Sequence, residues 1–388
     1  MTGINSTEER EVKLGRFVVD VHVHAQRHAA GAAVREAQRR EPGRSEYAVL
    51  SRVMREIDAY DNSERLLYDM DCYGVDMCVL LPAFGMSNEI NLQIVDRHPE
   101  RFVAVCNART YQQRVWRGEE EWTIEGVCAE LDRLLATGRF VGIGEGSPYV
   151  PQPNDPTRPV SMQAAIGNML AILEVAAKHR VPVQIHTGCT MGYEVRYSTG
   201  LGPLNFNPLW VHDLAASFPQ VPIILNHGGI QGWWSEKLYE DCLHVAAAHA
   251  NVYLETGLWW SELYERAIAD PNIGAEKLLW GTDWGASIPF HYQPRRYPPV
   301  YAVQMPSQGL VRHQVDVWGW SLRELARLRV PQDELNLILG GNAARLYRLP
   351  VPHRRLFREP RTAPARPFPE APKETTGAET RVDAAIGE

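Results

Sequence analysis

Residues 17–23 read FVVDVHV, a run of apolar side chains that is broken only by Asp20 and His22. A nearly continuous apolar run, without strict alternation, is typical of a strand that is buried on both faces. Strands of this kind occur in parallel sheets whose two faces are covered by helices. The stretch therefore predicts a buried parallel strand, and the rest of the chain decides which parallel fold contains it.

Seven further runs of the same kind follow along the chain. They are VDMCVLL (75–81), FVAVCN (102–107), FVGIG (140–144), VPVQIH (181–186), VPIILNH (221–227), VYLET (252–256) and LLWGTD (278–283). Stretches with helical periodicity lie between them, at residues 63–73, 123–136, 162–179, 208–217, 235–249 and 261–270. Strands that alternate with helices indicate βαβ units and a parallel sheet. Eight such units predict an α/β fold of the (β/α)₈ TIM-barrel type rather than an open doubly wound sheet.

Three segments do not follow this alternation. Residues 25–60 are rich in Arg and Ala, and we interpret them as an insertion after the first strand. Residues 287–314 hold many prolines and aromatic residues, which indicates a long irregular loop after the eighth strand. From residue 352 onward the chain is rich in Pro, Ala and Arg, which is typical of a tail that wraps the surface or stays disordered. We therefore predict an N-terminal lead (1–16), one barrel domain (17–350) and a C-terminal tail (351–388).

The composition of the chain excludes several classes of protein. It has 388 residues, of which 40 are Lys or Arg and 47 are Asp or Glu, so its net charge is −7. This charge argues against nucleic acid or an anionic membrane surface as the main partner. The longest apolar stretch, residues 77–84, is far shorter than the ~20 residues that span a bilayer. Because the N-terminus shows no apolar signal segment and the six cysteines form no CxxC pair, we expect free thiols and a cytoplasmic protein.

Polar side chains that suit metal binding gather at the carboxyl ends of the predicted strands, which form the active-site rim of a barrel. His22 and His24 are two residues apart on one strand, so both imidazoles point to the same face. His186 ends the fifth strand and Asp283 the eighth, and they would complete a divalent metal site with an open position. His227 ends the sixth strand and suits general acid–base catalysis, because histidine titrates near neutral pH.

Each of these residues also has a plainer interpretation. An HxH pair can be two core or surface histidines, an aspartate at the position of Asp283 can cap a helix, and His227 before two glycines can bond to backbone at a turn. The occurrence of five such residues on strand ends favours the metal centre. The other histidines lie in helix-like or loop contexts, where solvated or capping roles are the default.

Four motifs and a closing segment resemble those of the amidohydrolase superfamily. They are DVHVH (20–24), QIHTG (184–188), LNHGG (225–229), WGTDWG (280–285) and ILGGNAARLYRL (338–349). The resemblance covers about residues 17–349 and points to the branch related to aminocarboxymuconate-semialdehyde decarboxylase, the amidohydrolase-2 group. It implies that His22, His24, His186 and Asp283 bind one metal ion and that His227 is the catalytic acid or base. We therefore assign His227 and Asp283 to catalysis.

The resemblance implies two classes of reaction that use the same ligands. Our first hypothesis is a metal-dependent, non-oxidative decarboxylase of a small aromatic carboxylic acid with hydroxy or amino substituents. The alternative is a metal-dependent hydrolase that cleaves an amide, a lactone or a ring C–N or C–Cl bond with a metal-activated water. A third hypothesis, a non-catalytic barrel used for binding, is disfavoured by the intact ligand set.

Three features depart from parts of that family. Several hydroxybenzoate decarboxylases have Glu in place of the first His of HxH, whereas HVH is intact here, which favours semialdehyde decarboxylase-like or hydrolytic members. No lysine ends the fourth or fifth strand, so a two-metal site bridged by a carbamylated lysine is not expected. The segment after TDW reads GASIPF, where TD-Y/W-P is more usual.

The expected cofactor is one divalent metal ion, with Zn²⁺ as the first expectation and Mn²⁺ as the second. The tryptophans near the rim would either stack on a flat ring or pack a long loop, and Glu145 would hold a bound water or a substrate group or pair with a neighbouring side chain. We expect a small aromatic acid as substrate and a homodimer as the assembly, with no nucleic acid or membrane partner. The residues that we single out for substrate binding are Glu145, Arg196, Trp259, Trp284 and His291.

Overall fold

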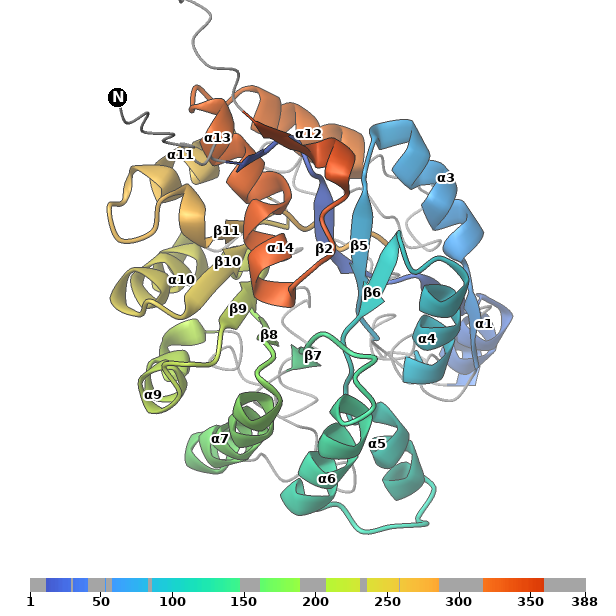
Figure 1. Ribbon diagram of the computed structural model, residues 1–388. Helices are drawn as coiled ribbons and strands as arrows, with labels where there is room; N and C mark the ends of the chain where they lie inside the picture. Colours follow the sequence, from blue (N-terminus) through green and yellow to red (C-terminus); the bar gives the residue numbers. More distant parts are fainter. Residues whose placement is uncertain are drawn as a thin grey trace, which may run out of the picture.

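The computed structural model describes residues 12–28, 31–40, 53, 58–82, 86–146, 161–188, 207–230, 236–257, 259–285 and 317–358, and these form an α/β barrel (Figure 1). Each of the eight predicted strands is confirmed, although all are shorter than their sequence runs. They are β2 (Val19–Val23), β5 (Met77–Leu80), β6 (Phe102–Ala104), β7 (Ile143–Gly146), β8 (Val183–His186), β9 (Ile223–Asn226), β10 (Val252–Glu255) and β11 (Leu278–Leu279).

All eight strands run parallel, and short links join them into a ring. One sheet has the order β2-β5-β6 and the other the order β11-β10-β9-β8-β7. A parallel bridge between Cys106 and Ile143 joins β6 to β7, and one between Val23 and Trp284 joins β2 to the segment after β11. The backbone N–H of Val21 also donates to the carbonyl of Trp280 at 3.1 Å. The first and last strands therefore meet along a short seam.

Helices surround the ring (Figure 1), and the six predicted helical stretches are confirmed. Several begin with a side-chain cap of the expected kind: Ser87, Thr123 and Ser161 each accept a hydrogen bond from the backbone N–H three residues later. No described helix is long and apolar enough to cross a membrane. In the described part of the chain, the α-helices outside the first insertion are α3 (Ser63–Tyr73), α4 (Asn88–Arg97), α5 (Arg109–Trp116), α6 (Ile124–Leu135), α7 (Met162–His179), α9 (Val211–Ser217), α10 (Glu236–Ala248), α11 (Ser261–Ala269), α12 (Val317–Ala326), α13 (Gln332–Asn336) and α14 (Asn342–Tyr347).

The apolar core has two parts. Val19 and Val21 of β2 belong to a smaller cluster that also contains Ala343 and Tyr347 of α14. Helix α14 crosses the ring of strands in Figure 1, so this cluster fills the barrel interior at one end. The larger cluster lies between the strands and the surrounding helices. The carboxyl ends of the strands, which carry the polar side chains, lie at the opposite end of the barrel.

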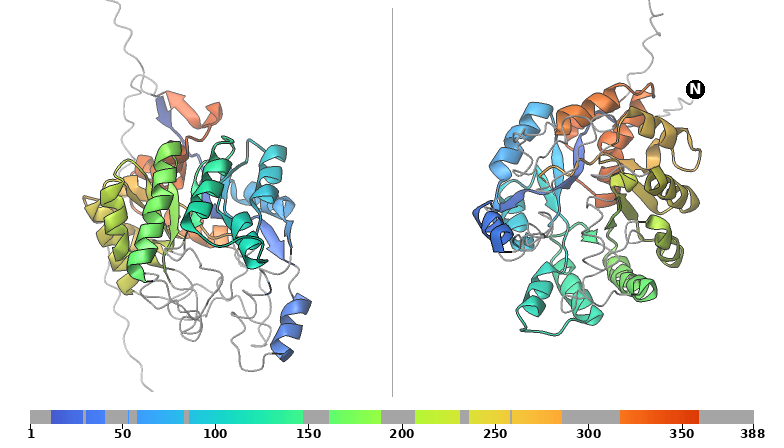
Figure 2. Two further views of the ribbon diagram at one scale, coloured as in Figure 1. Left: turned by 90° about the horizontal axis from the view of Figure 1, so that it is seen from below. Right: turned by 180° about the vertical axis from the view of Figure 1, so that it is seen from behind.

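Two strand pairs were not predicted. In the first insertion, β3 (Gln26–His28) pairs with β4 (Ala59–Asp61), and α1 (Gly31–Arg40) lies between them in sequence. At the other end of the barrel, β1 (Val12–Leu14) pairs with β12 (Leu356–Arg358), as the side view in Figure 2 shows. Residues of the predicted lead and tail thus form one antiparallel ribbon, while the division into lead, barrel and tail stays a prediction. The loop predicted at residues 287–314 and the tail beyond residue 358 lie outside the described residues.

Candidate metal centre

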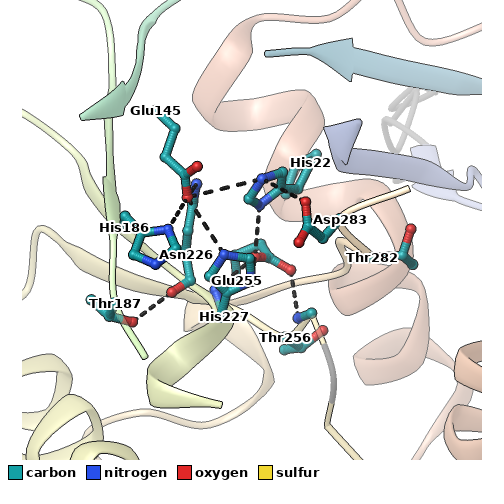
Figure 3. Close-up of polar contacts among 12 residues, drawn as sticks. His22, Glu145, His186, Thr187, Asn226, His227, Glu255, Thr256, Thr282 and Asp283 are labelled. Atoms are coloured by element: carbon teal, nitrogen blue, oxygen red, sulfur yellow. Dashed lines mark hydrogen bonds and ion pairs between the residues drawn. The ribbon is translucent and has the colours of Figure 1, made fainter. Parts of the chain in front are cut away.

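Three ligand atoms, from His22, His24 and Asp283, meet where the first and last strands of the barrel end. Figure 3 shows two of these residues, His22 and Asp283. Nε2 of His22 lies 3.3 Å from Nε2 of His24 and 3.5 Å from Oδ1 of Asp283. Nε2 of His24 lies 3.1 Å from the same oxygen. Two ligand atoms that are each ~2.1 Å from a tetrahedral ion are about 3.4 Å apart. The spacing of these three atoms therefore fits one metal ion.

The hydrogen bonds behind the two imidazoles direct their lone pairs to this point. Nδ1 of His24 faces the carbonyl oxygen of Leu81 at 2.9 Å, and Nδ1 of His22 faces Oε2 of Glu255 at 3.1 Å. A carbonyl and a carboxylate only accept hydrogen bonds, so in the neutral ring Nδ1 carries the proton and Nε2 carries the lone pair. With both rings neutral, His22, His24 and Asp283 bring together three electron-pair donors with no hydrogen between them. This donor set fits a divalent cation.

Glu145, His186 and His227 form a second cluster next to the first one. Oε1 of Glu145, on β7, lies 2.8 Å from Nδ1 of His186, on β8, and 3.5 Å from Nε2 of His227. The same oxygen accepts a hydrogen bond of 3.1 Å from the side-chain amide of Asn226. Potential ligand atoms of His186, Glu145 and His227 all lie within 4.8 Å of one another. That His186 shares the ion of His22 stays a prediction.

His227 lies between the two clusters and is buried. Its ring centroid is 4.8 Å from that of His22 and 5.0 Å from that of His186. Neither ring nitrogen has a hydrogen-bond partner among the described residues, and the nearest carboxylates are those of Glu145 and Glu255, at 3.5 Å from Nε2 and 3.7 Å from Nδ1. The residue has a left-handed φ of 64° at the end of β9, a conformation that costs free energy for a side chain of this kind. A buried imidazole whose nitrogens face carboxylates but have no hydrogen-bond partner is suited to proton exchange with a bound molecule.

The charges around the centre favour a bound cation. Burial acts to lower the pKa of His22, yet the surrounding carboxylates, Glu145 first, raise it to about 10. Burial acts to raise the pKa of Asp283, yet the neighbouring imidazoles, His22 first, lower it to about 2. The pKa of Glu145 is likewise lowered well below its usual value, against burial, by His186 and His22. The carboxylates therefore stay ionised, and in the metal-free protein His22 holds a second proton, so a bound metal ion would take the place of that positive charge.

Asp20 holds the two sides of the barrel seam together behind the ligands. Its Oδ1 accepts hydrogen bonds from the backbone N–H groups of His22 and Thr282, at 2.9 and 3.2 Å. Its Oδ2 accepts from the hydroxyl of Thr282 at 2.5 Å and from the indole of Trp318 at 2.6 Å. Asp283 follows directly and has a φ of 57°. Asp20 thus fixes both ligand-bearing segments, a role that the sequence analysis missed although Asp20 begins the DVHVH motif.

Glu255 is a second residue that the sequence analysis did not single out. It ends β10, is fully buried, and contacts both His22 and His227. The available signal was its position, because it is a carboxylate at the carboxyl end of the seventh predicted strand. A single glutamate in the run VYLET does not by itself distinguish such a role from a solvated strand end.

The two tryptophans predicted to contact substrate have the contacts of packed residues. Trp259 is fully buried, and its indole N–H donates to the carbonyl of His227 at 3.1 Å. Trp284 is 8% exposed, its indole N–H donates to Asp69 at 3.2 Å, and the guanidinium of Arg27 lies 5.1 Å from the centre of its ring. A substrate contact by either residue stays a prediction.

Of the other three residues predicted to bind substrate, Glu145 lies in the described part of the chain, whereas Arg196 and His291 do not. Glu145 lies among the histidines of the centre, as described above, and its contact with a substrate stays a prediction. Arg27, on β3, donates to the carbonyl oxygens of His24, Gln26 and Gly285.

Solved structures that are similar to this chain include two of 2,6-dihydroxybenzoate decarboxylase and one of an amidohydrolase. The 2,6-dihydroxybenzoate decarboxylase from Rhizobium is 16% identical, with a TM-score of 0.49 over 86% of this chain and 99% of its own. A structure of 2,6-dihydroxybenzoate decarboxylase complexed with 2,6-dihydroxybenzoate is 16% identical, with a TM-score of 0.50 over 87% and 100% of the two chains. Amidohydrolase 2 from Bifidobacterium longum subsp. infantis is 14% identical, with a TM-score of 0.45 over 86% and 100%.

Sequence comparison identifies the family. No curated protein matches the chain significantly. The profile of the Amidohydrolase family matches residues 19–349, which include the strands of the barrel and both segments that carry the candidate ligands His22, His24 and Asp283. The chain belongs to the amidohydrolase family.

Proposed function

We propose that this protein is a metal-dependent, non-oxidative decarboxylase of a small aromatic carboxylic acid that carries a hydroxy or amino group. The observation that carries this proposal is the triad of His22, His24 and Asp283 beside His227, whose ring nitrogens have no hydrogen-bond partner in the described part of the chain. The similarity in fold to 2,6-dihydroxybenzoate decarboxylase supports it at the level of the scaffold. We propose Zn²⁺ as the metal, with Mn²⁺ as the second candidate, and a homodimer as the assembly.

In this proposal, different residues of the centre bind the metal ion and transfer the proton. When bound, the metal ion supplies a positive charge that holds an anionic group of the substrate. His227 carries a proton at Nε2 and delivers it to the ring carbon that bears the carboxylate. A C–H bond forms there, the C–C bond to the carboxylate breaks, its electron pair returns to the ring, and CO₂ leaves. Glu145, 3.5 Å from Nε2, keeps the imidazole directed to the substrate.

Hydrolysis is the second candidate, and the position of Glu145 favours it. Its Oε1 lies 2.8 Å from Nδ1 of His186 and 3.5 Å from Nε2 of His227. A carboxylate in this position can accept a proton from an attacking water and pass it to a leaving group through His227. The substrate would then be an amide, a lactone or a ring with a C–N or C–Cl bond.

Isotope incorporation distinguishes the two reactions. The metal-loaded protein is incubated with a panel of hydroxy- and aminobenzoates in D₂O, and separately with amides, lactones and chlorinated or aminated heteroaromatic rings in H₂¹⁸O. A decarboxylase releases one CO₂ per product and places one deuterium on the vacated ring carbon. A hydrolase places ¹⁸O in the organic product, and that result without any CO₂ release would replace the decarboxylase proposal with the hydrolase one.

A further inference from the structure

The carboxylate of Glu255 contacts two histidines of the candidate centre, His22 and His227. Glu255 ends β10 and is fully buried. Its Oε2 lies 3.1 Å from Nδ1 of His22 and accepts a hydrogen bond of 2.7 Å from the backbone N–H of His227. Its Oε1 accepts a hydrogen bond of 2.5 Å from the backbone N–H of Gly257. Figure 3 shows Glu255 below the imidazole of His22 and beside that of His227.

The backbone around Glu255 leaves room for this carboxylate. A Cβ added to Gly281 would lie 2.5 Å from Oε1 of Glu255, and one added to Gly257 would lie 3.2 Å from it. Both glycines flank the carboxylate, Gly257 just after β10 and Gly281 just after β11. A larger residue at Gly281 would occupy the space of the carboxylate itself. The two glycines therefore leave open the space that the carboxylate of Glu255 occupies.

The burial of Glu255 is not explained by an ordinary salt bridge. Among the described residues, its hydrogen bonds and ion pairs are with His22, His227 and Gly257, and none is with a lysine or arginine. A buried carboxylate costs several kcal/mol unless hydrogen bonds and charges compensate it. Because its burial costs free energy and its side-chain partners are His22 and His227, we infer that Glu255 has a role in the candidate metal centre.

The contacts of Oε2 determine which atom of His22 faces the metal centre. A carboxylate accepts hydrogen bonds, so His22 carries its proton at Nδ1 and presents the lone pair of Nε2 to His24 and Asp283. Carboxylates that orient metal-binding histidines in this way also increase the basicity of the ring. The same oxygen holds the backbone of His227 in its left-handed conformation.

We propose that Glu255 is a positioning residue that fixes the tautomer of His22 and the place of His227, and so couples metal affinity to proton transfer. The proposal rests on the proposed function in one respect, namely that His22 binds the metal and His227 transfers the proton. It excludes two other roles for Glu255: a direct metal ligand, and a buried carboxylate that acts on stability alone.

Metal affinity tests the proposal without any substrate. The affinity of the metal-free protein for Co²⁺ and Zn²⁺ is measured by competition with a chelator, for the wild type and for Glu255→Gln. Glutamine has the same shape, but its amide replaces one accepting oxygen with a donor that faces N–H groups. We expect Glu255→Gln to bind either metal ten- to a hundredfold more weakly. Glu324→Gln is the matched control, because Glu324 is a buried carboxylate that accepts from Ser261 and pairs with Arg327 away from the centre, and we expect it to keep wild-type affinity.

The spectrum of the bound Co²⁺ separates positioning from ligation. If Glu255 only positions His22, the visible absorption of Glu255→Gln with saturating Co²⁺ keeps the intensity of the wild type. A change that indicates the loss of one ligand would overturn the proposal, as would a metal affinity within twofold of the wild type in a folded variant. In turnover, we expect kcat of the variant to fall more than KM rises.

A measurement on the wild type keeps the proposal testable if Glu255→Gln does not fold. In zinc-loaded protein labelled with ¹⁵N-histidine, NMR distinguishes a ring that is protonated at Nδ1 from one that is protonated at Nε2, and the signals of His22 are assigned by their loss in His22→Asn. We expect a proton on Nδ1 of His22 and zinc on Nε2. The opposite tautomer would overturn the proposal. If these metal-binding results hold while no benzoate releases CO₂, the proposed reaction fails and the role of Glu255 stands.

Discussion

At the scale of single residues, the proposed roles assign metal binding and proton transfer to different side chains. His24 contributes a lone pair to the ligand triad, with its other nitrogen held by the carbonyl of Leu81. We expect His24→Ala to lose most of its metal affinity and its activity together. We expect His227→Asn to keep one metal ion per chain and to lose about 100- to 10,000-fold in kcat, the usual contribution of general acid–base catalysis.

Metal content by elemental analysis and steady-state kinetics check both variants. Arg133→Ala is a suitable control, because Arg133 pairs with Glu130 on α6, on the outside of the barrel. It is expected to match the wild type in metal content and kcat. A His227→Asn variant with kcat within threefold of the wild type would contradict the assigned role of His227.

The residues of the centre differ in how far the sequence predicts them. The meeting of His22, His24 and Asp283 follows from strand ends and spacing, because the barrel brings the carboxyl ends of all its strands to one rim. The contribution of Asp20 and Glu255 does not follow. Each has a contact with a residue more than 200 positions away, and the one local signal, the position of Glu255 at the end of a predicted strand, does not specify that contact.

At the scale of secondary structure, the segment that ends the barrel explains part of the motif ILGGNAARLYRL. Gly340 is buried, and a Cβ added there would lie 2.1 Å from the carbonyl oxygen of Phe17. We expect Gly340→Ala to destabilise the fold by about 1–3 kcal/mol or more, because backbone must move to admit the methyl group. Gly167 is exposed on α7 with nothing within 4 Å of an added Cβ, and we expect Gly167→Ala to stabilise the fold by up to about 1 kcal/mol.

Urea denaturation followed by circular dichroism measures both changes in the free energy of unfolding. The pair is informative because both substitutions add one methyl group to a glycine. If Gly340→Ala were as stable as Gly167→Ala, the close approach of Gly340 to Phe17 would not exist in solution.

A histidine pair on the outer helices gives the fold a pH dependence. Nδ1 of His212 on α9 lies 2.8 Å from Nε2 of His249, so one ring must be neutral. Burial first, then the charges of His249 and His244, lower the pKa of His212 below its usual 6.5, while Asp213 acts to raise it. The unfolded chain therefore takes up this proton at a higher pH than the folded chain does. The stabilisation that His212 provides is present above about pH 6.5, and it decreases as the pH falls toward the lower pKa of the folded chain.

Urea midpoints between pH 7.5 and 5 check this effect. We expect His212→Asn to lose stability less steeply below pH 6.5 than the wild type does. Asp213→Asn removes the carboxylate that opposes the shift, so it is expected to steepen the loss. Identical slopes for His212→Asn and the wild type would contradict a coupled histidine pair.

The buried strands of the barrel could be predicted from the sequence, whereas the ribbon of β1 and β12 could not. The buried strands of the barrel are visible as apolar runs because both of their faces pack. The ribbon of β1 and β12 joins segments more than 340 residues apart, and each is only three residues long. A strand of that length has no periodicity of its own, and its pairing depends on the barrel having already brought the chain ends together.

At the scale of the whole molecule, the metal centre lies on the seam that closes the barrel. His22 and His24 belong to the first strand and the residue just after it, whereas Asp283 follows the last strand. The seam itself has little backbone pairing, with one bridge between Val23 and Trp284 and hydrogen bonds such as that from His24 to Trp284 at 2.8 Å. A metal ion bound by these three side chains would therefore connect the two ends of the sheet.

Removal of the metal is for this reason expected to destabilise the whole fold. A ligand that binds only the folded chain contributes about 2.7 kcal/mol at a concentration 100 times its Kd. We expect chelation of the wild type to lower the free energy of unfolding by about this amount, and re-addition of Zn²⁺ to restore it, as measured by urea denaturation. His24→Ala lacks a ligand on one side of the seam, so its stability is expected to be nearly independent of zinc, whereas His212→Asn, far from the centre, is expected to keep the full zinc dependence. A wild-type protein that binds zinc tightly and yet unfolds at the same urea concentration with and without it would mean that the ion does not connect the first and last strands.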